Sequence, residues 1–430
     1  MHDITEHERS VERAAYDADR ATVAGIEHLR FFPLVTERSE GSILYTPSGR
    51  ALIDFSASWG AASFGHADPR ISDAVCAAVR RGEGVSVLSG ALPTTTRLAE
   101  RLRARIPVRS PGCVYLGLGG TDANSVAIRA ARRATGRNRV VSFTGSYHGG
   151  HGLGQQTQGF GEDPGDHGLT SIFEYPLSAA MLRELAPRLH GHLARKQTAC
   201  VIVEAVQCDG GVRVPADGFL SMLRQVCDHT GTLLICDEVK IGLGRTGDDV
   251  GYRREGVLPD LVTLGKALGG GLPVSAVVGP ARALAEPTAS ALLTLAGTSV
   301  GAAAAGAVLD LLDDDLLDHV RARGAQAREL IRGYRGAGRP GSTLVTDVRG
   351  RGLLLGVEVD STTTAALTCY RAWELGCVFY IVRDNVLELT PPLGITAELL
   401  AEGLGILTRA LDDVAAGAVD PAVLDEFDGW

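Results

Sequence analysis

The stretch that decides the fold runs from residue 233 to residue 266, where LLICDEV (233–239) and LVTLGK (261–266) each carry an apolar run into charged residues. Neither run alternates polar with apolar side chains, which is typical of strands buried on both faces of a sheet. The first run leads to Asp237 and the second to Lys266, 29 residues later (266 − 237). The two strand ends therefore present an acid and an amine.

Further apolar runs lie on both sides of this stretch and alternate with helix-like segments. Between about Gly112 and Gly279 they are CVYLGL, RVVSF, CVIVEAV and SAVVG, separated by segments such as TDANSVAIRAARRA and FLSMLRQVCDH. Short buried strands that alternate with amphipathic helices predict an α/β fold with a mainly parallel sheet and helices on both faces. In such sheets the chemistry gathers at the carboxyl ends of the strands.

Beyond Thr298 the pattern changes to that of a smaller α+β domain. The alanine-rich GAAAAGAVLDLLDDDLLDHV predicts a long helix, and the strand-like LVTDV, GLLLGVEV, CVFYIV and VLELT follow it. The N-terminal residues contain the short strands SILY and ALIDF around a PSG turn. The predicted organisation is an N-terminal segment of the small domain (1–60), a large domain (61–320) and the C-terminal part of the small domain (321–430).

The composition argues against a nucleic-acid-binding or membrane protein. The 430 residues carry 42 Lys plus Arg and 51 Asp plus Glu, a formal net charge of −9, and show no basic stripe for a nucleic-acid backbone. The charged N-terminus lacks the apolar core of a secretory signal, which favours a cytoplasmic location, and polar residues interrupt the most membrane-like stretch, 292–312. The eight cysteines contain no CxxC pair and are expected to be reduced.

Lysine is nearly absent from this chain. Three of the 42 basic residues are lysines, Lys196, Lys240 and Lys266, so the other 39 (42 − 3) are arginines. Lys196 lies in the polar LARKQT and is expected to be a surface charge, whereas Lys240 and Lys266 follow apolar runs. A lysine amine can lose its proton and attack a carbonyl, which makes these two residues candidates for catalysis.

A third strand end completes a set of groups with a shared chemistry. CVYLGLGGTDA (113–123) ends in glycines before a helix, whose first N–H groups can bind a phosphate. A phosphate cradle, a carboxylate and a lysine are the groups that pyridoxal 5′-phosphate (PLP) requires, although an ion pair between Asp237 and Lys266 is an open alternative. His148 and His151 have no carboxylate at ligand spacing, so no metal site is expected.

In its motifs the chain resembles the class III aminotransferases, fold type I PLP enzymes that include ω-amino acid transaminases and several racemases. The matching runs are IDFSASWGAASFGHADP, GGTDANSVAIRAARRATGRNRVVSFTGSYHGG, VIVEAVQCDGGVRVPADGFL, LLICDEVKIGLGRTG, PDLVTLGKALGGGLPVSAVVG, VRGRGLLLGVEV and VLELTPPLGIT. The resemblance implies a large domain with a mainly parallel seven-stranded sheet, a smaller α+β domain, and a homodimer as the functional unit.

The resemblance also implies which residues hold the cofactor ring. Lys266 is expected to be the Schiff-base lysine, and Asp237 the partner of the pyridine nitrogen. The ring is expected to lie between Val239 and Tyr147. Glu204 matches an acid that the family places near the ring hydroxyl.

Other matching positions are expected to hold the phosphate and the substrate. Gly120 and Thr121 correspond to the phosphate-binding part of the family's SGTEA run, and Thr298 is expected to reach the phosphate from the neighbouring subunit. Trp59 falls in the stretch that lines the substrate pocket. His66 is expected to hydrogen-bond the turn before a helix.

Four departures from the family pattern bear on the substrate. SGTEA is replaced by GGTDA, and TxxGNP is replaced by TSVGAA. Where many members hold the substrate α-carboxylate with an arginine, this chain has Glu388, and where transaminases commonly have glutamine after DEV it has Lys240. Together with Asp209, Lys240 resembles the α-amino-ε-caprolactam racemase branch, in which the matching residues act as acid and base. A plain ion pair between Lys240 and Asp209 or Glu204 is the competing interpretation.

Two enzymatic functions and one non-enzymatic function remain in competition. The leading interpretation is an aminotransferase for an amine substrate without an arginine-bound α-carboxylate, with an amino sugar of aminoglycoside (antibiotic) biosynthesis as the candidate, because the arginine, alanine and glycine usage resembles that of actinomycete proteins. The alternative is a racemase or epimerase that uses Lys240 and Asp209 as a second acid and base. A PLP-binding scaffold without turnover is the third.

Overall fold

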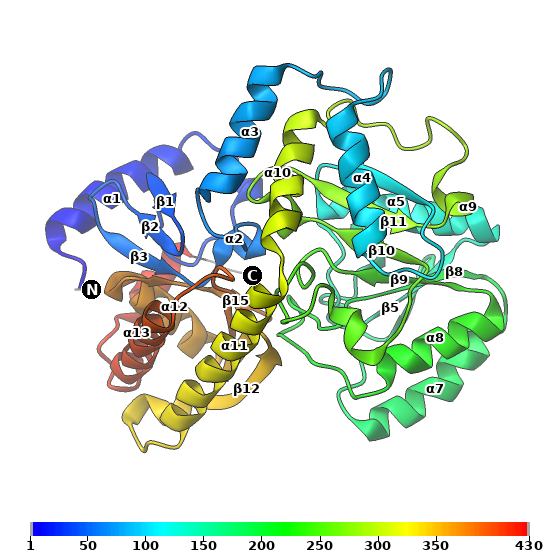
Figure 1. Cartoon of the computed structure of the whole chain (residues 1–430). Helices are drawn as coiled ribbons and strands as arrows, with labels where there is room; N and C mark the ends of the chain where they lie inside the picture. The colour runs from blue at the N-terminus through cyan, green and yellow to red at the C-terminus, as the bar shows by residue number, and fades with distance from the viewer. Residues whose placement is uncertain (1–2, 428–430) are drawn as a thin grey trace. The chain divides into compact units, whose positions relative to one another are not determined.

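The computed structural model describes residues 3–427, which fall into two compact units (Figure 1). The large unit comprises residues 69–317, and the small unit comprises the residues up to Asp68 together with those from Asp318 onward. Each unit has its own sheets. Within the described residues, no helix combines the length and the apolar character that a membrane span needs.

An eight-stranded sheet forms the centre of the large unit. Its spatial order is β4 (Cys113–Gly117), β11 (Ser275–Gly279), β10 (Leu261–Leu264), β9 (Leu233–Asp237), β8 (Thr198–Val203), β5 (Arg139–Phe143), β7 (Thr170–Phe173) and β6 (Gly165–His167). The run from β10 to β7 is parallel, and β11 is antiparallel to both of its neighbours. The expected seven strands are accompanied by one more, the three-residue edge strand β6, which pairs antiparallel with β7. The carboxyl ends of β4, β5, β8, β9 and β10 therefore share one edge of the sheet.

Helices cover both faces of this sheet. On one face α5 (Gly120–Thr135) buries its alanine-rich side in a cluster with strand residues such as Val140. Phe143, three residues further along β5, points to the other face and meets Phe219 of α8 (Phe219–Thr230) edge to face at 5.1 Å. α7 (Ala179–Leu193) packs beside α8 (Figure 1). The uninterrupted apolar strands of the sequence are explained by burial on both faces.

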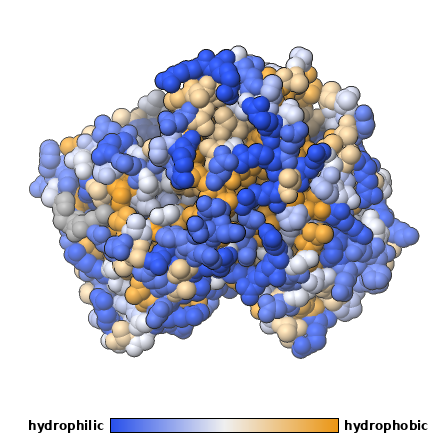
Figure 2. Space-filling model, viewed as in Figure 1, coloured by the Kyte–Doolittle hydropathy of each residue, from blue (hydrophilic) through white to orange (hydrophobic). Residues whose placement is uncertain are grey.

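Two longer helices of the large unit, α3 (Pro69–Arg81) and α4 (Pro93–Arg105), both pack on a third, α10 (Ser299–Leu311). Where they meet, an apolar floor that includes Ala302 and Ala303 lies between hydrophilic side chains (Figure 2). The remaining short elements of this unit are α6 (Gly152–Thr157), α9 (Ala281–Leu284) and the 3₁₀ turns η2 (Gly251–Glu255) and η3 (Lys266–Gly269). The long helix α11 (Asp314–Arg335) begins in the large unit and continues into the small one.

The small unit contains two four-stranded sheets. One has the order β1 (Arg38–Glu40), β2 (Ile43–Tyr45), β3 (Ala51–Asp54) and β14 (Cys377–Val378), and the other has the order β12 (Val345–Arg351), β13 (Leu354–Val359), β16 (Val386–Leu389) and β15 (Tyr380–Val382). The stretch CVFYIV, expected as one strand, is thus divided between both sheets. The other elements are α1 (Glu6–Arg20), η1 (Gly25–Glu27), α2 (Ala57–Gly60), η4 (Pro340–Leu344), α12 (Thr362–Leu375), α13 (Ala397–Ala415) and η5 (Pro421–Glu426).

A buried ion pair fastens the N-terminal helix α1 to the rest of the small unit. Arg50 contacts Glu12 of α1 at 2.9 Å, and the two side chains are 2% and 1% exposed. Arg50 also donates to the backbone carbonyl of Trp373 at 2.8 Å. Because a buried charge without its partner is strongly destabilising, this pair fixes where α1 lies.

Candidate active site

The carboxyl edge of the large sheet brings together nine of the predicted site residues. Each lies at or just after the end of a strand, or at the start of the helix that follows β4. They are Gly120, Thr121, Tyr147, Glu204, Asp209, Asp237, Val239, Lys240 and Lys266. Residues far apart in the chain meet here because parallel strands end at the same edge.

Asp237 is the most firmly held member of this group. Its Oδ2 accepts hydrogen bonds from Asn124 Nδ2 and His148 Nδ1, both at 2.8 Å, and its Oδ1 accepts one from the backbone N–H of Val239 at 3.0 Å. Because a carboxylate only accepts, His148 carries its proton on Nδ1. The carboxylate is 3% exposed and has one fixed orientation at the end of β9.

Sequence analysis did not find His148 and Asn124 as partners of Asp237. From the sequence, the pair His148 and His151 suggests at most a metal ligand, and no motif marks Asn124. One signal was present: Asn124 is a polar residue on the otherwise alanine-rich, buried face of α5, where a polar side chain needs a partner. Nothing in the sequence indicates that this partner is the acid at the end of β9.

The backbone that leads into Lys266 lies beside the first turn of α5. A Cβ added to Gly265 would lie 3.3 Å from the backbone nitrogen of Gly120, and one added to Gly120 would lie 2.4 Å from a methyl group of Val239. Glycine at these two positions therefore lets the strand end, the helix start and the Val239 side chain approach closely. Lys266 itself has a φ of +40°, a strained conformation for a residue with a side chain and one that clusters at functional sites.

The start of α5 is shaped by Asp122. Its carboxylate accepts hydrogen bonds from the backbone N–H groups of Gly119 at 2.8 Å and Leu118 at 3.2 Å, and from Ser275 Oγ at 3.1 Å. The N–H groups of the first helical turn, those of Gly120 and Thr121, have no acceptor within the helix. The GGTDA run thus keeps a helix N-terminus that can receive an anion.

A second group of charges lies at the ends of β8 and β9. Lys240 Nζ contacts Asp209 Oδ1 at 3.3 Å, and both side chains are buried. Burial opposes ionisation of Asp209, but the charges of Lys240 and Lys266 lower its pKa. Burial and the charges of Asp237 and Asp209 raise the pKa of Glu204 well above its usual value. This environment therefore favours the ionised form of Asp209 and the protonated form of Glu204.

Tyr147 follows β5 and is half-buried. Burial and the charge of Asp209 raise the pKa of its phenol, and Lys240 lowers it. Its hydroxyl lies near Gly150, where an added Cβ would be 3.3 Å away. The loop continues over Thr121, whose Oγ1 would lie 2.6 Å from a Cβ on Gly149. This loop therefore joins the end of β5 to the first turn of α5.

Two predicted substrate residues lie in the small unit. The Trp59 ring stacks on Tyr380 with centroids 4.5 Å apart. Glu388 of β16 is the register partner of Tyr380 of β15, so the two side chains share one face of their sheet. Glu388 is 1% exposed. Tyr380 is therefore a direct neighbour of both Trp59 and Glu388.

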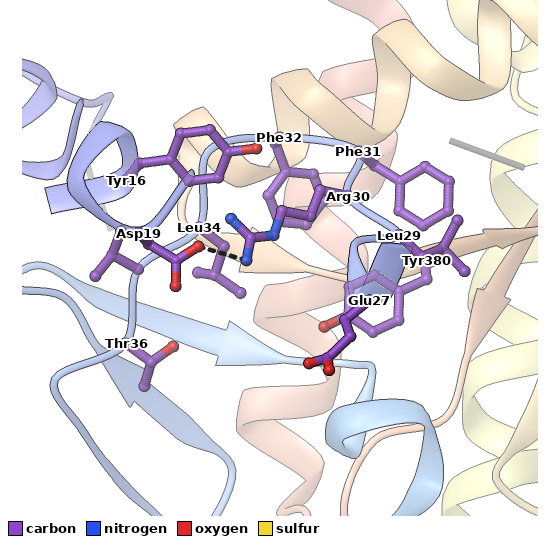
Figure 3. A pocket seen from close by; sticks show the side chains of 11 residues that line it. Tyr16, Asp19, Glu27, Leu29, Arg30, Phe31, Phe32, Leu34, Thr36 and Tyr380 are labelled. Carbon is purple, nitrogen blue, oxygen red and sulfur yellow. Dashed lines mark ion pairs between the residues drawn. The ribbon is translucent and has the colours of Figure 1, made fainter. Parts of the chain in front are cut away.

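Tyr380 also borders a pocket that the sequence did not predict. In Figure 3, Phe31 and Tyr380 lie on one side of a cavity of about 380 Å³, and Asp19 and Arg30, paired at 2.6 Å, lie on the other. Phe31 also approaches Trp59, with ring centroids 6.4 Å apart. Phe31 and Tyr380 thus contact Trp59 and also line this pocket.

Thr298, expected to act in the neighbouring subunit, begins α10. Its side chain accepts a hydrogen bond from the backbone N–H of Gly301 at 3.1 Å, as an N-cap residue does. All eight cysteines are free thiols.

Comparisons with known proteins show the family and the fold. The family model for aminotransferase class-III matches residues 26–411. The chain is 31% identical to a leucine/methionine racemase from Thermococcus litoralis (93% of this chain, 95% of the relative) and 36% identical to an acetylornithine aminotransferase from Streptomyces coelicolor (90% and 92%). The solved ornithine aminotransferase from Toxoplasma gondii matches with a TM-score of 0.83 at 25% identity, over 96% of this chain and 100% of that one. The fold is that of the fold type I enzymes, and the chain belongs to the class III aminotransferase family, whose members depend on PLP.

Proposed function

We propose that this protein is an aminotransferase that moves an amino group to or from an amine substrate which no arginine holds by an α-carboxylate. The observation that carries the proposal is Asp237, aimed by Asn124 and His148, with Lys266 following the adjacent strand. A structural ion pair would not need a carboxylate fixed by two further buried donors. Aminotransferases among the relatives support the reaction class.

The residues present fit PLP. A carboxylate that can only accept hydrogen bonds suits the protonated pyridine nitrogen, and the first turn of α5, with Gly120 and Thr121, suits the phosphate. Glu204 Oε2 is buried and, among the described residues, has no hydrogen-bond partner. The raised pKa of Glu204 favours the protonated form of this carboxyl, which would let it donate to the ring oxygen. We assign one ring face to Val239 and the other to Tyr147.

The step that the protein's own residues carry out in the proposed reaction is the transfer of one proton. When bound, PLP withdraws electrons from the amine-bearing carbon of the substrate and makes its C–H bond acidic. We assign the transfer of that proton to Lys266 Nζ, because a lysine amine can act as both base and acid. The strained backbone at Lys266 fixes where this side chain begins.

Glu388 decides the proposed substrate class. A carboxylate at this position repels a substrate α-carboxylate and attracts an ammonium group. The aromatic faces of Trp59 and Tyr380 near it suit a cation as well. We therefore propose a cationic amine, with an amino sugar as the candidate class.

The buried pair of Lys240 and Asp209 favours a second candidate, a racemase or epimerase. Inversion needs a second group that moves a proton on the opposite face of the reacting carbon, in addition to Lys266. Lys240 Nζ, held 3.3 Å from Asp209, is the group that we assign to this role. Racemases among the relatives support this alternative.

One experiment separates the two functions. The holoenzyme is incubated with cationic amines and α-amino acids in deuterated water, with and without a keto acid, and products are followed by NMR and chiral chromatography. An aminotransferase requires the acceptor, and Lys240→Gln leaves its transfer largely intact. An epimerase inverts without acceptor and loses inversion in Lys240→Gln, which would overturn the leading proposal. Absence of turnover and of deuterium exchange for every amine would indicate a scaffold.

We also propose that the functional unit is a homodimer. The loops 82–92 and 285–298 approach each other at the start of α10, where Ser299, directly after the second loop, donates from Oγ to the carbonyl of Gly84 at 3.0 Å. They expose large apolar side chains, namely Val85, Leu88, Leu292 and Leu295. Apolar residues gathered in this way indicate a surface that another chain covers.

A further inference from the structure

Trp59 sits on an unusual piece of backbone. Ala57, Ser58 and Trp59 have φ angles of 43°, 50° and 59°, so three consecutive residues with side chains adopt the left-handed conformation. Side chains disfavour this region, and it persists only where the surrounding structure holds it. Something in the small unit must therefore stabilise the turn.

The side chain of Asp54 makes the contacts that can do so. Its Oδ1 accepts hydrogen bonds from the backbone N–H and Oγ of Ser56, both at 2.7 Å, and from the backbone N–H of Ala57 at 3.0 Å. Asp54 is fully buried at the end of β3. Its Oδ1 thus fixes the two residues that lead into the left-handed turn.

His66 holds the other oxygen of Asp54. His66 Nε2 lies 2.7 Å from Asp54 Oδ2, and the backbone of His66 pairs with Gly41 in both directions, at 2.9 and 2.8 Å. The side chain of His66, expected to bond the turn before a helix, thus contacts the carboxylate of Asp54. Since the His66 backbone is itself fixed, the carboxylate cannot rotate without losing this contact.

The far side of the turn is fixed by the C-terminal part of the small unit. Thr390 donates from Oγ1 to the carbonyl of Ser56 at 3.1 Å and from its backbone N–H to the carbonyl of Phe55 at 2.7 Å. The Trp59 ring that leaves this turn lies almost parallel to Tyr380, at an angle of 28°. The turn, rather than the side-chain rotamer alone, determines where the indole lies.

We propose that Asp54 and His66 are positioning residues that hold the turn 57–59 left-handed and so present the Trp59 ring to the substrate. This inference rests on the proposed role of Trp59 in the substrate pocket. Neither residue touches the reacting atoms, and both act through Trp59. Their chemistry is that of a carboxylate oriented by an imidazole, used here to shape a binding surface.

The test uses the holoenzyme and its variants His66→Ala, His66→Gln, Asp54→Ala, Trp59→Phe and Trp59→Ala. Near-ultraviolet circular dichroism reports the Trp59–Tyr380 stack directly, and the difference between wild type and Trp59→Phe defines the Trp59 contribution. We expect His66→Ala to lose this contribution and His66→Gln, whose amide can donate to Asp54, to retain it. In the Trp59→Phe background, His66→Ala should add no further spectral change.

Kinetics provide the second readout. For the amine that the deuterium experiment identifies, we expect His66→Ala to raise KM about 10-fold with kcat nearly unchanged, because the displaced ring weakens binding rather than proton transfer. A lower melting temperature with an unchanged Trp59 signal in both His66→Ala and Asp54→Ala would overturn the inference. If Asp54→Ala does not fold, the two His66 variants decide alone. An unchanged KM in Trp59→Ala would refute only the substrate role of Trp59, because the spectral test does not depend on it.

Discussion

Asp237→Asn tests the centre of the proposed site. The wild-type carboxylate accepts hydrogen bonds from Asn124 and His148 on one oxygen and from the N–H of Val239 on the other. Asparagine has one acceptor oxygen and one NH₂ group, and in either orientation that NH₂ group faces at least one N–H donor. A hydrogen bond to a charged group contributes about 1.5–3 kcal/mol, so we expect the free energy of unfolding to fall by about that amount.

The same substitution should also lower activity, by a separate effect. A neutral partner stabilises a protonated pyridine nitrogen less than a carboxylate does, by about 1.5–3 kcal/mol, which corresponds to a loss of about 10- to 150-fold in kcat. Denaturant unfolding measures the first effect, and kcat with saturating PLP measures the second. The matched control is Asp260→Asn, because Asp260 is also buried and accepts bonds at 2.8 Å from Arg224 and from the N–H of Leu234, but lies at the start of β10. Asp260→Asn should lose stability and keep kcat, and a near-wild-type kcat in Asp237→Asn would refute the assigned role.

Four further results are expected. Lys266→Ala should lose the visible absorbance of covalently bound PLP that borohydride bleaches, whereas Lys240→Ala should keep it, and the reverse pattern would contradict the assignment. Glu388→Gln should raise KM for cationic amines about 10-fold, while Glu358→Gln on the neighbouring strand should not; equal effects would remove Glu388 from substrate recognition. Burial raises the pKa of Glu238 from 4.5 to about 8, so as the pH rises the unfolded chain ionises this carboxyl before the folded chain does. The free energy of unfolding of the wild type should therefore fall relative to that of Glu238→Gln as the pH rises from 4.5 to 8. If the free energies of unfolding of the wild type and of Glu238→Gln change in parallel between pH 4.5 and 8, Glu238 does not cause the loss of stability. The double substitution Leu292→Asp and Leu295→Asp should shift the protein from dimer to monomer in light scattering, and a monomeric wild type would exclude the dimer.

The sequence determined the fold class and the place of the proposed site. Uninterrupted apolar runs such as LLICDEV and LVTLGK predict strands buried on both faces, and the residue that ends each predicted strand is then expected at the sheet edge. This local pattern was enough to select Asp237 and Lys266 and to anticipate the α/β architecture. The near absence of lysine strengthened the choice of Lys266.

The tertiary structure decided which side chains meet across that edge. Asn124 and His148 converge on Asp237 because α5 crosses the sheet and β5 lies two strands away from β9, relations that no local periodicity encodes. The division of CVFYIV between two sheets has the same origin, since each half pairs with a strand from a distant part of the chain.

The left-handed turn 57–59 shows most clearly what the local sequence does not predict. ASW contains no glycine, so local propensity argues against positive φ angles at these three positions. The turn exists because Asp54, His66 and Thr390 supply hydrogen bonds that outweigh its strain, and two of these three residues come from segments outside the turn's own strand. Sequence patterns record what a residue prefers in isolation, whereas only the folded chain brings together the partners that make an unfavourable conformation the stable one.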